Sequence, residues 1–131
     1  MYLIDTDWII DVFNNQTQAA ATLKRLADQG LAVSVITYGE LYQGAFYSRD
    51  PQRALAALPV FLSDKQILPI TTAIAERFGV IRGGLSPHQR RQVGDMDLLI
   101  AATALTHNLT LLTRNLADFR LVPGISIYSS T

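Results

Sequence analysis

Cysteine is absent from this sequence of 131 residues, which excludes disulfide bonds and thiolate metal sites. Histidine is scarce: only His88 and His107 occur, and no Cys–His cluster of the zinc-binding kind is present. The two histidines form no evident acid–base pair, and His107 is expected at a helix C-terminus, where the helix dipole favours a cation. An acid–base mechanism that relies on two histidines is therefore disfavoured.

A charge excess and a long apolar run are also missing. Eleven basic residues balance eleven acidic ones, which argues against broad electrostatic coating of nucleic acid but leaves room for a local basic patch. No apolar stretch approaches the roughly 18 residues that span a bilayer, and the first residues lack a signal-peptide layout. We therefore expect a cytoplasmic protein without a membrane segment, and its length predicts a single domain over residues 1–131.

Short apolar runs alternate with amphipathic segments along the chain, which predicts an α/β fold: a three-layer α/β/α sandwich with a mostly parallel central sheet. The expected strands are residues 2–4, 31–36, 67–70 and 109–113, with a final edge strand at 125–128. Helices are expected around residues 8–13, 17–29, 37–47, 51–62, 72–83 and 95–107, with one helical turn at 115–119. The Gly-, Pro- and polar-rich stretch 84–94 is predicted to be a loop.

Acidic residues gather where these strands end. Five of the eleven carboxylates fall in the four segments concerned, namely Asp5, Glu40, Asp95, Asp97 and Asp118. Each of them alone is at least as easily explained as a helix cap, a first-turn acid or an exposed turn residue. Glu40, for example, has the spacing to complete a capping box with Thr37, which would begin the helix there. Capping does not require that they share one edge, however, and parallel strands place their carboxyl ends together. A cluster of hard oxygen ligands there would suit Mg²⁺ or Mn²⁺.

Four motifs, in order along the chain, resemble those of PIN-domain nucleases. They are Leu3-Ile-Asp5-Thr-Asp7, Ile36-Thr-Tyr-Gly-Glu40, Val93-Gly-Asp-Met-Asp97 and Leu112-Thr-Arg-Asn-Leu-Ala-Asp118-Phe. The order and spacing match over essentially the whole chain, and the length is similar to that of the bacterial toxin branch called VapC. The resemblance implies a compact α/β/α fold, Mg²⁺-dependent cleavage of RNA (often tRNA or rRNA), silencing by a cognate antitoxin protein, and a homodimer.

The resemblance also implies roles for particular residues. Asp5, Glu40 and Asp97 match the core metal-binding and catalytic positions, and the fourth position falls on Asp118 or on Asn115, of which we favour Asp118. Supporting roles are expected for Thr6, Asp95, Thr113 and Asn115, although a turn or capping role is as good for each threonine. Asp7 departs from the family pattern, which usually has Asn there. In this mechanism a metal-activated water attacks the phosphodiester bond, and one carboxylate accepts its proton.

Basic and aromatic residues near these motifs are candidates for contacts with RNA and with a partner. Arg82, Arg90 and Arg91 lie in a stretch without acidic residues that leads into the Asp97 motif, and Arg114 follows the last core strand. They could bind phosphates, but a solvated surface explains the first three equally well. Tyr42 and Phe46, four residues apart on one helix, could form a patch for a second copy or an antitoxin helix.

Three other functions remain open at this point. A haloacid-dehalogenase-like phosphatase also begins with a strand followed by Asp-x-Asp, but it needs a supporting lysine and a later Gly-Asp-x-x-x-Asp. Lys24 and Lys65 are the only lysines, and Asp97 comes too soon after Gly94-Asp95. A phosphate-accepting receiver domain would need a lysine where Arg114 stands. The third alternative is a non-catalytic PIN-fold module that acts only through its partner.

Overall fold

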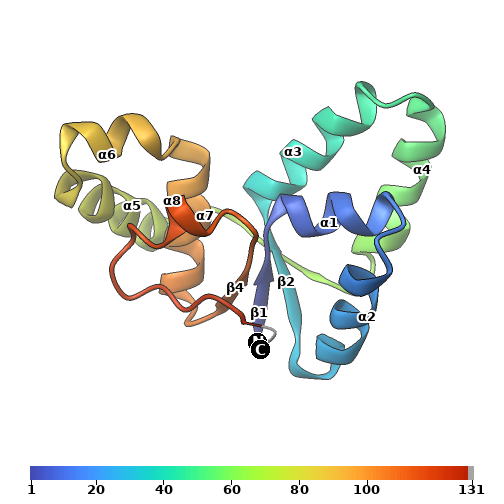
Figure 1. The fold of residues 1–131 in the computed structure, drawn as a ribbon, viewed down its shortest axis with the longest axis horizontal. Coiled ribbons are helices and arrows are strands. Elements are labelled where there is room, and N and C mark those ends of the chain that lie inside the picture. Colours follow the sequence, from blue (N-terminus) through green and yellow to red (C-terminus); the bar gives the residue numbers. More distant parts are fainter. Residues whose placement is uncertain (130–131) are drawn as a thin grey trace.

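The computed structural model describes residues 1–129 and has a parallel β-sheet between two layers of helices (Figure 1). The sheet consists of β1 (Tyr2–Ile4), β2 (Leu31–Ser34), β3 (Gln66–Leu68) and β4 (Thr110–Leu112) in the order β3-β2-β1-β4. All three strand pairs are parallel. The predicted α/β/α sandwich is confirmed.

The strands are buried on both faces, and their side chains alternate between two cores because successive residues of a strand point to opposite sides. Leu3 of β1 and Leu111 of β4 belong to the core under one helix layer, whereas Ile4 and Leu112 belong to the core under the other. All four side chains are fully buried. Three-residue strands therefore suffice to anchor both layers.

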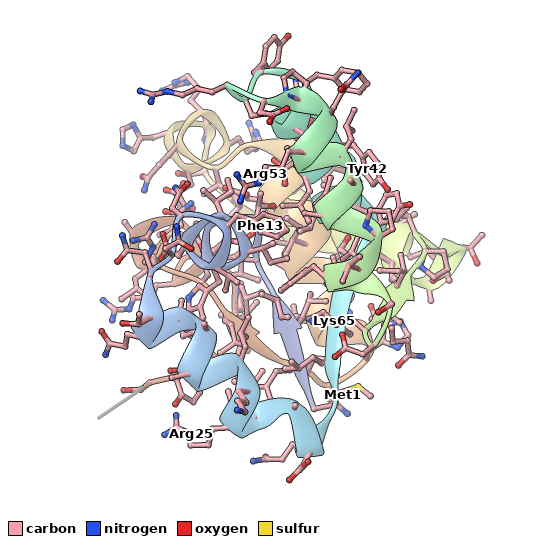
Figure 2. All side chains as sticks on the ribbon, turned by 90° about the vertical axis from the view of Figure 1, so that its right-hand side faces the viewer. Met1, Phe13, Arg25, Tyr42, Arg53 and Lys65 are labelled. Carbon is pink, nitrogen blue, oxygen red and sulfur yellow. The ribbon has the colours of Figure 1, made fainter. Side chains whose placement is uncertain are left out.

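The helices divide between the two layers in chain order. On one side of the sheet lie α1 (Thr6–Phe13), α2 (Thr17–Leu26), α3 (Val35–Phe46) and α4 (Pro51–Leu62), and on the other α5 (Thr72–Gly84), α6 (Pro87–Gln92), α7 (Asp95–Thr106) and α8 (Leu116–Phe119). A 3₁₀ turn at Ala27–Gln29 extends α2. Figure 2 looks onto the first layer from its side. Among residues 1–129, none of these helices has the length and apolar character needed to cross a bilayer.

Helix α3 begins two residues earlier than predicted, and the prediction that Thr37 and Glu40 form a capping box is wrong. The N-cap is Ser34, whose hydroxyl accepts a hydrogen bond from the Ile36 backbone N–H at 3.1 Å. This cap ends β2 at residue 34 instead of 36. Thr37 then falls inside the helix, fully buried, where its hydroxyl is available to the site described below.

Two other predictions need correction. The stretch 84–94 contains a short helix, α6, which Ser86 and Gln89 begin with a reciprocal capping box. The final edge strand at 125–128 is wrong as a strand, because its pairing with β4 amounts to one bridge between Leu111 and Ile127. Gly124, with φ of +81°, turns the chain immediately before this segment, so only a short stretch can run beside β4.

The chain order creates a switch point at the carboxyl edge of the sheet. From β1 the chain builds outward through β2 and β3, and it then returns to place β4 on the other side of β1. Ligand sites of open α/β sheets lie at such points. Residues directly after β1 and β4, which are 108 positions apart at Asp5 and Thr113, meet there.

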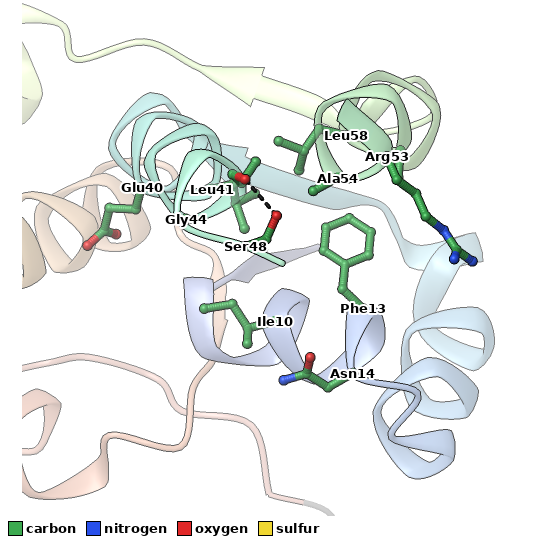
Figure 3. A pocket seen from close by; sticks show the side chains of 12 residues that line it. Ile10, Phe13, Asn14, Glu40, Leu41, Gly44, Ser48, Arg53, Ala54 and Leu58 are labelled. Atoms are coloured by element: carbon green, nitrogen blue, oxygen red, sulfur yellow. Dashed lines mark hydrogen bonds between the residues drawn. The ribbon is translucent and has the colours of Figure 1, made fainter. Parts of the chain in front are cut away.

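An apolar groove of about 390 Å³ runs between α1, α3 and α4. Figure 3 shows Phe13 of α1 reaching toward Ala54 of α4, with Glu40 at one end of the groove and Arg53 at the other. Leu41 of α3 also contributes to the wall. The groove thus has an apolar floor and opposite charges at its two ends.

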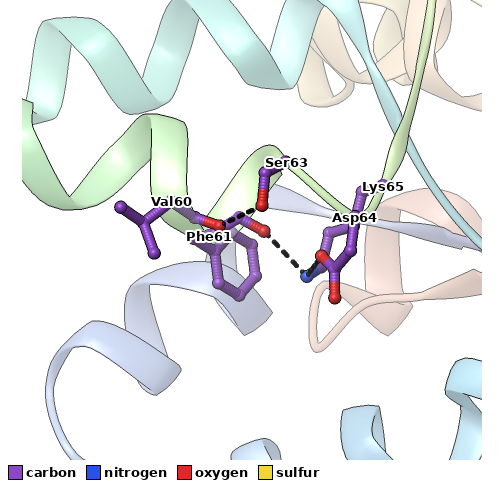
Figure 4. Close-up of polar contacts among 5 residues, drawn as sticks. All are labelled: Val60, Phe61, Ser63, Asp64 and Lys65. Atoms are coloured by element: carbon purple, nitrogen blue, oxygen red, sulfur yellow. Dashed lines mark hydrogen bonds and ion pairs between the residues drawn. The ribbon is translucent and has the colours of Figure 1, made fainter.

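The junction from α4 to β3 is closed by Lys65 (Figure 4). Its ammonium donates to the Phe61 carbonyl and to Asp64, both at 2.9 Å, and it lies 3.8 Å from the centre of the Phe61 ring. A cation favours both the helix C-terminus and an aromatic face. The Phe61 ring meets the Phe13 ring edge-on, with the ring centroids 5.4 Å apart. The junction therefore packs against a residue of the groove wall.

Ser34→Ala should lower the free energy of unfolding by about 1 kcal/mol, the usual cost of losing an N-cap. Urea unfolding measures the change. Ser63→Ala is the control, because this exposed hydroxyl bonds only to the Val60 carbonyl behind it, and its effect should stay within about 0.5 kcal/mol. Equal effects of the two substitutions would contradict the assignment of Ser34 as the cap.

Candidate active site

Asp5 lies at the centre of the acidic edge. It follows β1, begins α1 as the N-cap and is only 5% exposed. One carboxylate oxygen accepts from the Thr6 backbone N–H at 2.8 Å, and the other accepts from the Thr113 hydroxyl at 2.7 Å. Burial, opposed by the Thr113 bond and aided by the charges of Asp7 and Asp97, raises the pKa of Asp5 to about 6.

Glu40 reaches the same edge from α3. Its carboxylate accepts a hydrogen bond from the Thr6 hydroxyl at 2.8 Å, and the Thr37 hydroxyl lies 3.2 Å from that of Thr6. Because Thr6 follows Asp5 directly, this contact ties the start of α1 to α3. The predicted supporting position of Thr6 is therefore between two of the proposed ligands.

Asp97 and Asp118 meet around the side chain of Asn115. The Asn115 amide donates to Asp97 at 3.2 Å and to Asp118 at 3.0 Å, and the Gln92 amide donates to the other Asp118 oxygen at 3.0 Å. Burial and then the charges of Glu40 and Asp118 raise the pKa of Asp97. The charges that act on Asp97 come from Glu40, Asp118 and Asp7, which belong to the three other predicted segments. The four segments predicted to meet therefore do so.

Asp7 holds the loop after β4 in place. Its carboxylate accepts from the Arg114 backbone N–H at 3.1 Å. The Thr113 hydroxyl, which lies beside it, accepts from the Asn115 N–H at 3.0 Å. Burial raises the pKa of Asp7, and its second oxygen is buried without a partner within residues 1–129. Asp7 is thus more than a helix cap: it positions the segment that carries Thr113 and Asn115.

The predicted arginines and Asp95 lie outside this hydrogen-bonded cluster. Arg82 forms an exposed ion pair with Asp95 at 3.0 Å, and the Arg90 guanidinium donates to the Leu85 carbonyl at 2.9 Å. Arg91 is exposed. Arg114 stands nearer, with its guanidinium 3.0 Å from Asp11. Arg82, Arg90 and Arg114 are therefore held by neighbours, and within residues 1–129 no side chain of the four arginines bonds to the acidic cluster.

Sequence reasoning missed the contributions of Thr37, Gln92 and Asp11. The sequence pattern favours Thr37 as a cap and predicts a loop at Gln92. A loop has no helical register, so nothing in the pattern places Gln92 beside Asp118. Asp11 carried no signal of its own, because its partner Arg114 is 103 residues away in the chain. Only the period of α1, which puts residues 7 and 11 on one face, pointed to a link between Asp11 and the site.

The donor set suits a hard divalent cation, since every polar group at the edge is a carboxylate, a hydroxyl or an amide. The carboxylates also raise one another's pKa, which a cation would relieve. Within residues 1–129, however, no group of three or more acidic or histidine side chains is arranged to hold a metal ion as it stands. Thr6, Thr113 and Asn115 instead satisfy the carboxylates, so metal binding requires side chains of this cluster to rotate.

An open α/β sheet with an acidic cluster at its switch point defines the class of this protein. The family model described as PIN domain matches residues 2–124. The chain therefore belongs to the PIN-domain family, and its relatives place it among the nuclease hydrolases of that family.

Curated relatives and solved structures agree on the branch. The chain is 32% identical to a tRNA(fMet)-specific endonuclease VapC of Salmonella typhimurium, with 96% of this chain and 95% of the relative covered. It is 35% identical to ribonuclease VapC2 of Haemophilus influenzae, covering 92% and 91%. VapBC2 from Rickettsia felis, solved bound to a promoter DNA fragment, has a chain that matches with a TM-score of 0.85 and 26% identity over 97% and 96%.

Asp5 should make the folded protein less stable as the pH rises, and Asp5→Asn should remove that effect. The folded-state pKa of about 6 exceeds the ordinary value of 3.8, so the folded protein binds this proton more tightly than the unfolded chain. The resulting stability is present below pH 3.8 and is lost as the pH rises through about 6. It amounts to roughly 3 kcal/mol at most.

Urea unfolding with a metal chelator, from about pH 4 to about pH 7.5, measures this contribution. Asp64→Asn is the control, because Asp64 is exposed and Lys65 lowers its pKa, so this variant should keep the fall of stability with pH. A fall of the same size in Asp5→Asn would show that Asp5 does not cause it.

Proposed function

We propose that this chain is a metal-dependent endoribonuclease and the toxin of a toxin–antitoxin pair, with Mg²⁺, or Mn²⁺, held by Asp5, Glu40, Asp97 and Asp118. The observation that carries the proposal is the convergence of these carboxylates at the switch point. Thr6 bonds to both Asp5 and Glu40, and Asn115 bonds to both Asp97 and Asp118. Thr113 joins the two pairs, because it donates to Asp5 and accepts from the Asn115 backbone N–H. PIN-domain ribonucleases generally depend on a divalent metal, in agreement with the all-oxygen donor set.

The side chains around the carboxylates have separate tasks in this proposal. Thr113 and the Thr6 N–H orient Asp5, and the Thr6 hydroxyl orients Glu40. Asn115 holds Asp97 and Asp118 together as a neutral donor, which favours Asp118 over Asn115 as the fourth acidic ligand. When bound, the metal lowers the pKa of a water molecule and stabilises charge on the phosphate oxygens. One carboxylate of the site would accept the proton of that water.

The positions of the lysines argue against the phosphatase and receiver alternatives. Lys65 closes the junction after α4, Lys24 lies on α2, and neither contacts the acidic edge. Arg114 stands after β4, where a receiver domain would need lysine. The non-catalytic alternative differs from the proposed enzyme only in activity, which the first experiment below measures.

We assign the apolar groove between α1, α3 and α4 to the antitoxin. Solved structures similar to this chain include DNA-bound VapBC from Salmonella typhimurium, at 30% identity and a TM-score of 0.83, and a toxin–antitoxin complex from Klebsiella pneumoniae, at 35% identity and 0.73. Glu40 belongs both to the groove and to the acidic cluster. An antitoxin segment in the groove can therefore place an arginine against the carboxylates, which a guanidinium matches bidentately.

The residues of α3 that form the groove differ from the predicted ones. Tyr42 contacts Tyr38, with ring centroids 4.9 Å apart, and Phe46 is 65% exposed; neither forms the groove. Gly44 and Ala45 form its wall instead. We therefore propose that the antitoxin binds the face of α3 that carries Gly44 and Ala45, and not the neighbouring face that carries Tyr42 and Phe46. The homodimer and the cytoplasmic location stay predictions.

Asp97→Asn should reduce RNA cleavage by about 100-fold or more, because it removes a charge directed at the metal and phosphate. Purified protein and labelled RNA are incubated with Mg²⁺ and, separately, with chelator, which should stop cleavage. Asp95→Asn is the matched control, two residues away in the same helix turn but paired with Arg82 outside the cluster; it should keep most activity. Full activity of Asp97→Asn, or cleavage in chelator, would refute the metal site.

Gly44→Leu should weaken antitoxin binding by about tenfold or more, because the new side chain occupies the groove. A Cβ atom at Gly44 meets nothing within 4 Å, so the fold should tolerate the change. Titration calorimetry with the antitoxin encoded beside this chain gives the affinity. Gly79→Leu on α5 is the control, since its Cβ also meets nothing and lies in the other helix layer. Equal affinities of both variants would place the antitoxin elsewhere.

A further inference from the structure

A second pocket, of about 670 Å³, lies beside the acidic cluster. Its size falls in the range of small-ligand sites. Trp8 of α1, Gln18 of α2, Arg120 after α8 and Tyr128 contribute to its wall, together with Thr113 and Arg114. Since Thr113 also donates to Asp5 at 2.7 Å, the pocket begins one side chain away from the proposed metal ligands.

The charge of the pocket is opposite to that of the cluster. Two arginines, Arg114 and Arg120, and one carboxylate, Asp11, are the charged residues among those that form it. Asp11 holds the Arg114 guanidinium by one contact at 3.0 Å, whereas a guanidinium carries five N–H donors. The Arg114 side chain is 62% exposed. An oriented guanidinium with remaining donors is suited to a phosphate oxygen.

The pocket also offers aromatic surface. Trp8 and Tyr128 meet edge to face, with ring centroids 6.1 Å apart and planes at 87°. Aromatic side chains beside a positive surface are the usual means of binding single-stranded nucleic acid.

We propose that this pocket binds the nucleotide of the RNA substrate next to the cleaved phosphodiester bond, with Arg114 and Arg120 at its phosphate and Trp8 and Tyr128 at its base. The inference rests on the proposed ribonuclease function for the identity of the ligand. An RNA strand is the ligand that explains the neighbouring charges together: one phosphate lies at the acidic cluster with its metal, and the next lies at the arginines. The arginines thereby set the register of the strand at the site.

Trp8 is the only tryptophan of the chain, so its fluorescence reports directly on this pocket. The full chain, in chelator to prevent cleavage, is titrated with a single-stranded RNA dodecamer of mixed sequence and, separately, with adenosine monophosphate. RNA should quench the emission. The mononucleotide should need about tenfold or higher concentration, because it lacks the neighbouring phosphates that add electrostatic affinity.

Arg120→Ala should weaken RNA binding about fivefold, and it should lower the slope of log affinity against log salt by about 0.7, the value for one phosphate contact on a single strand. Arg49→Ala is the matched control, because it removes the same charge from the exposed turn between α3 and α4, outside both pockets. Its binding midpoint should stay within about twofold of the unsubstituted protein.

Three results would overturn the proposal: no quenching by RNA, equal weakening by the two arginine substitutions, or equal affinity for the mononucleotide. Quenching by the antitoxin where RNA gives none would make the pocket a protein-docking site, and equal affinity for the mononucleotide would make it a free-nucleotide site. Failure of the proposed function has a different signature. Binding of RNA in the pocket without cleavage in Mg²⁺ contradicts the enzyme alone, and cleavage without Trp8 quenching contradicts the pocket alone.

Discussion

The hydrogen bond from Thr113 to Asp5 is the contact on which the acidic edge depends. It joins the ends of β1 and β4, which are adjacent in the sheet because the chain reverses its direction of growth between them. Strands of three residues have little pairing of their own, so their side chains have to be buried in both cores to hold the ends in register. The site is thus a product of the two cores on either side of the sheet.

Carboxylates that repel one another would disperse into solvent unless neutral donors held them. Here the donors come from Thr6, Thr113 and Asn115. Thr6 lies between two acidic residues in the chain, whereas Thr113 and Asn115 belong to the segment after β4. The pKa values of Asp5 and Asp97 are nevertheless raised, first by burial and then by the neighbouring charges. The fold stores unfavourable electrostatic energy at the edge, and a bound cation would release it.

The parts of the structure that follow from local pattern could be predicted from the sequence. Apolar runs placed β1 and β4, and because parallel strand ends share an edge, Asp5, Glu40, Asp97 and Asp118 were expected to meet before their geometry was known. The cap of α3 could not be chosen in this way, since Ser34 and Thr37 are both good caps and the spacing to Glu40 favoured the wrong one. Packing in the folded chain selects Ser34 as the cap, because Thr37 is buried inside the helix and contacts Thr6 there.

Contacts between distant segments were equally out of reach. The ion pair of Asp11 with Arg114 and the bond from Gln92 to Asp118 depend on how α1 and α6 lie against α8. Helix α6 has only six residues, mostly polar, too short for a period to be detected. Its capping box was the one local signal, and the glycines on either side, together with Pro87 at its first position, obscured it.

Glu40 faces two environments at once, the apolar groove and the acidic cluster. Any occupant of the groove that changes the position or the charge of this carboxylate also changes how strongly the cluster holds a cation. Thermodynamic linkage makes this relation reciprocal: the factor by which the groove ligand weakens cation binding equals the factor by which the cation weakens the groove ligand. A single glutamate would thereby let the supply of divalent cation and the supply of the groove ligand act on one equilibrium.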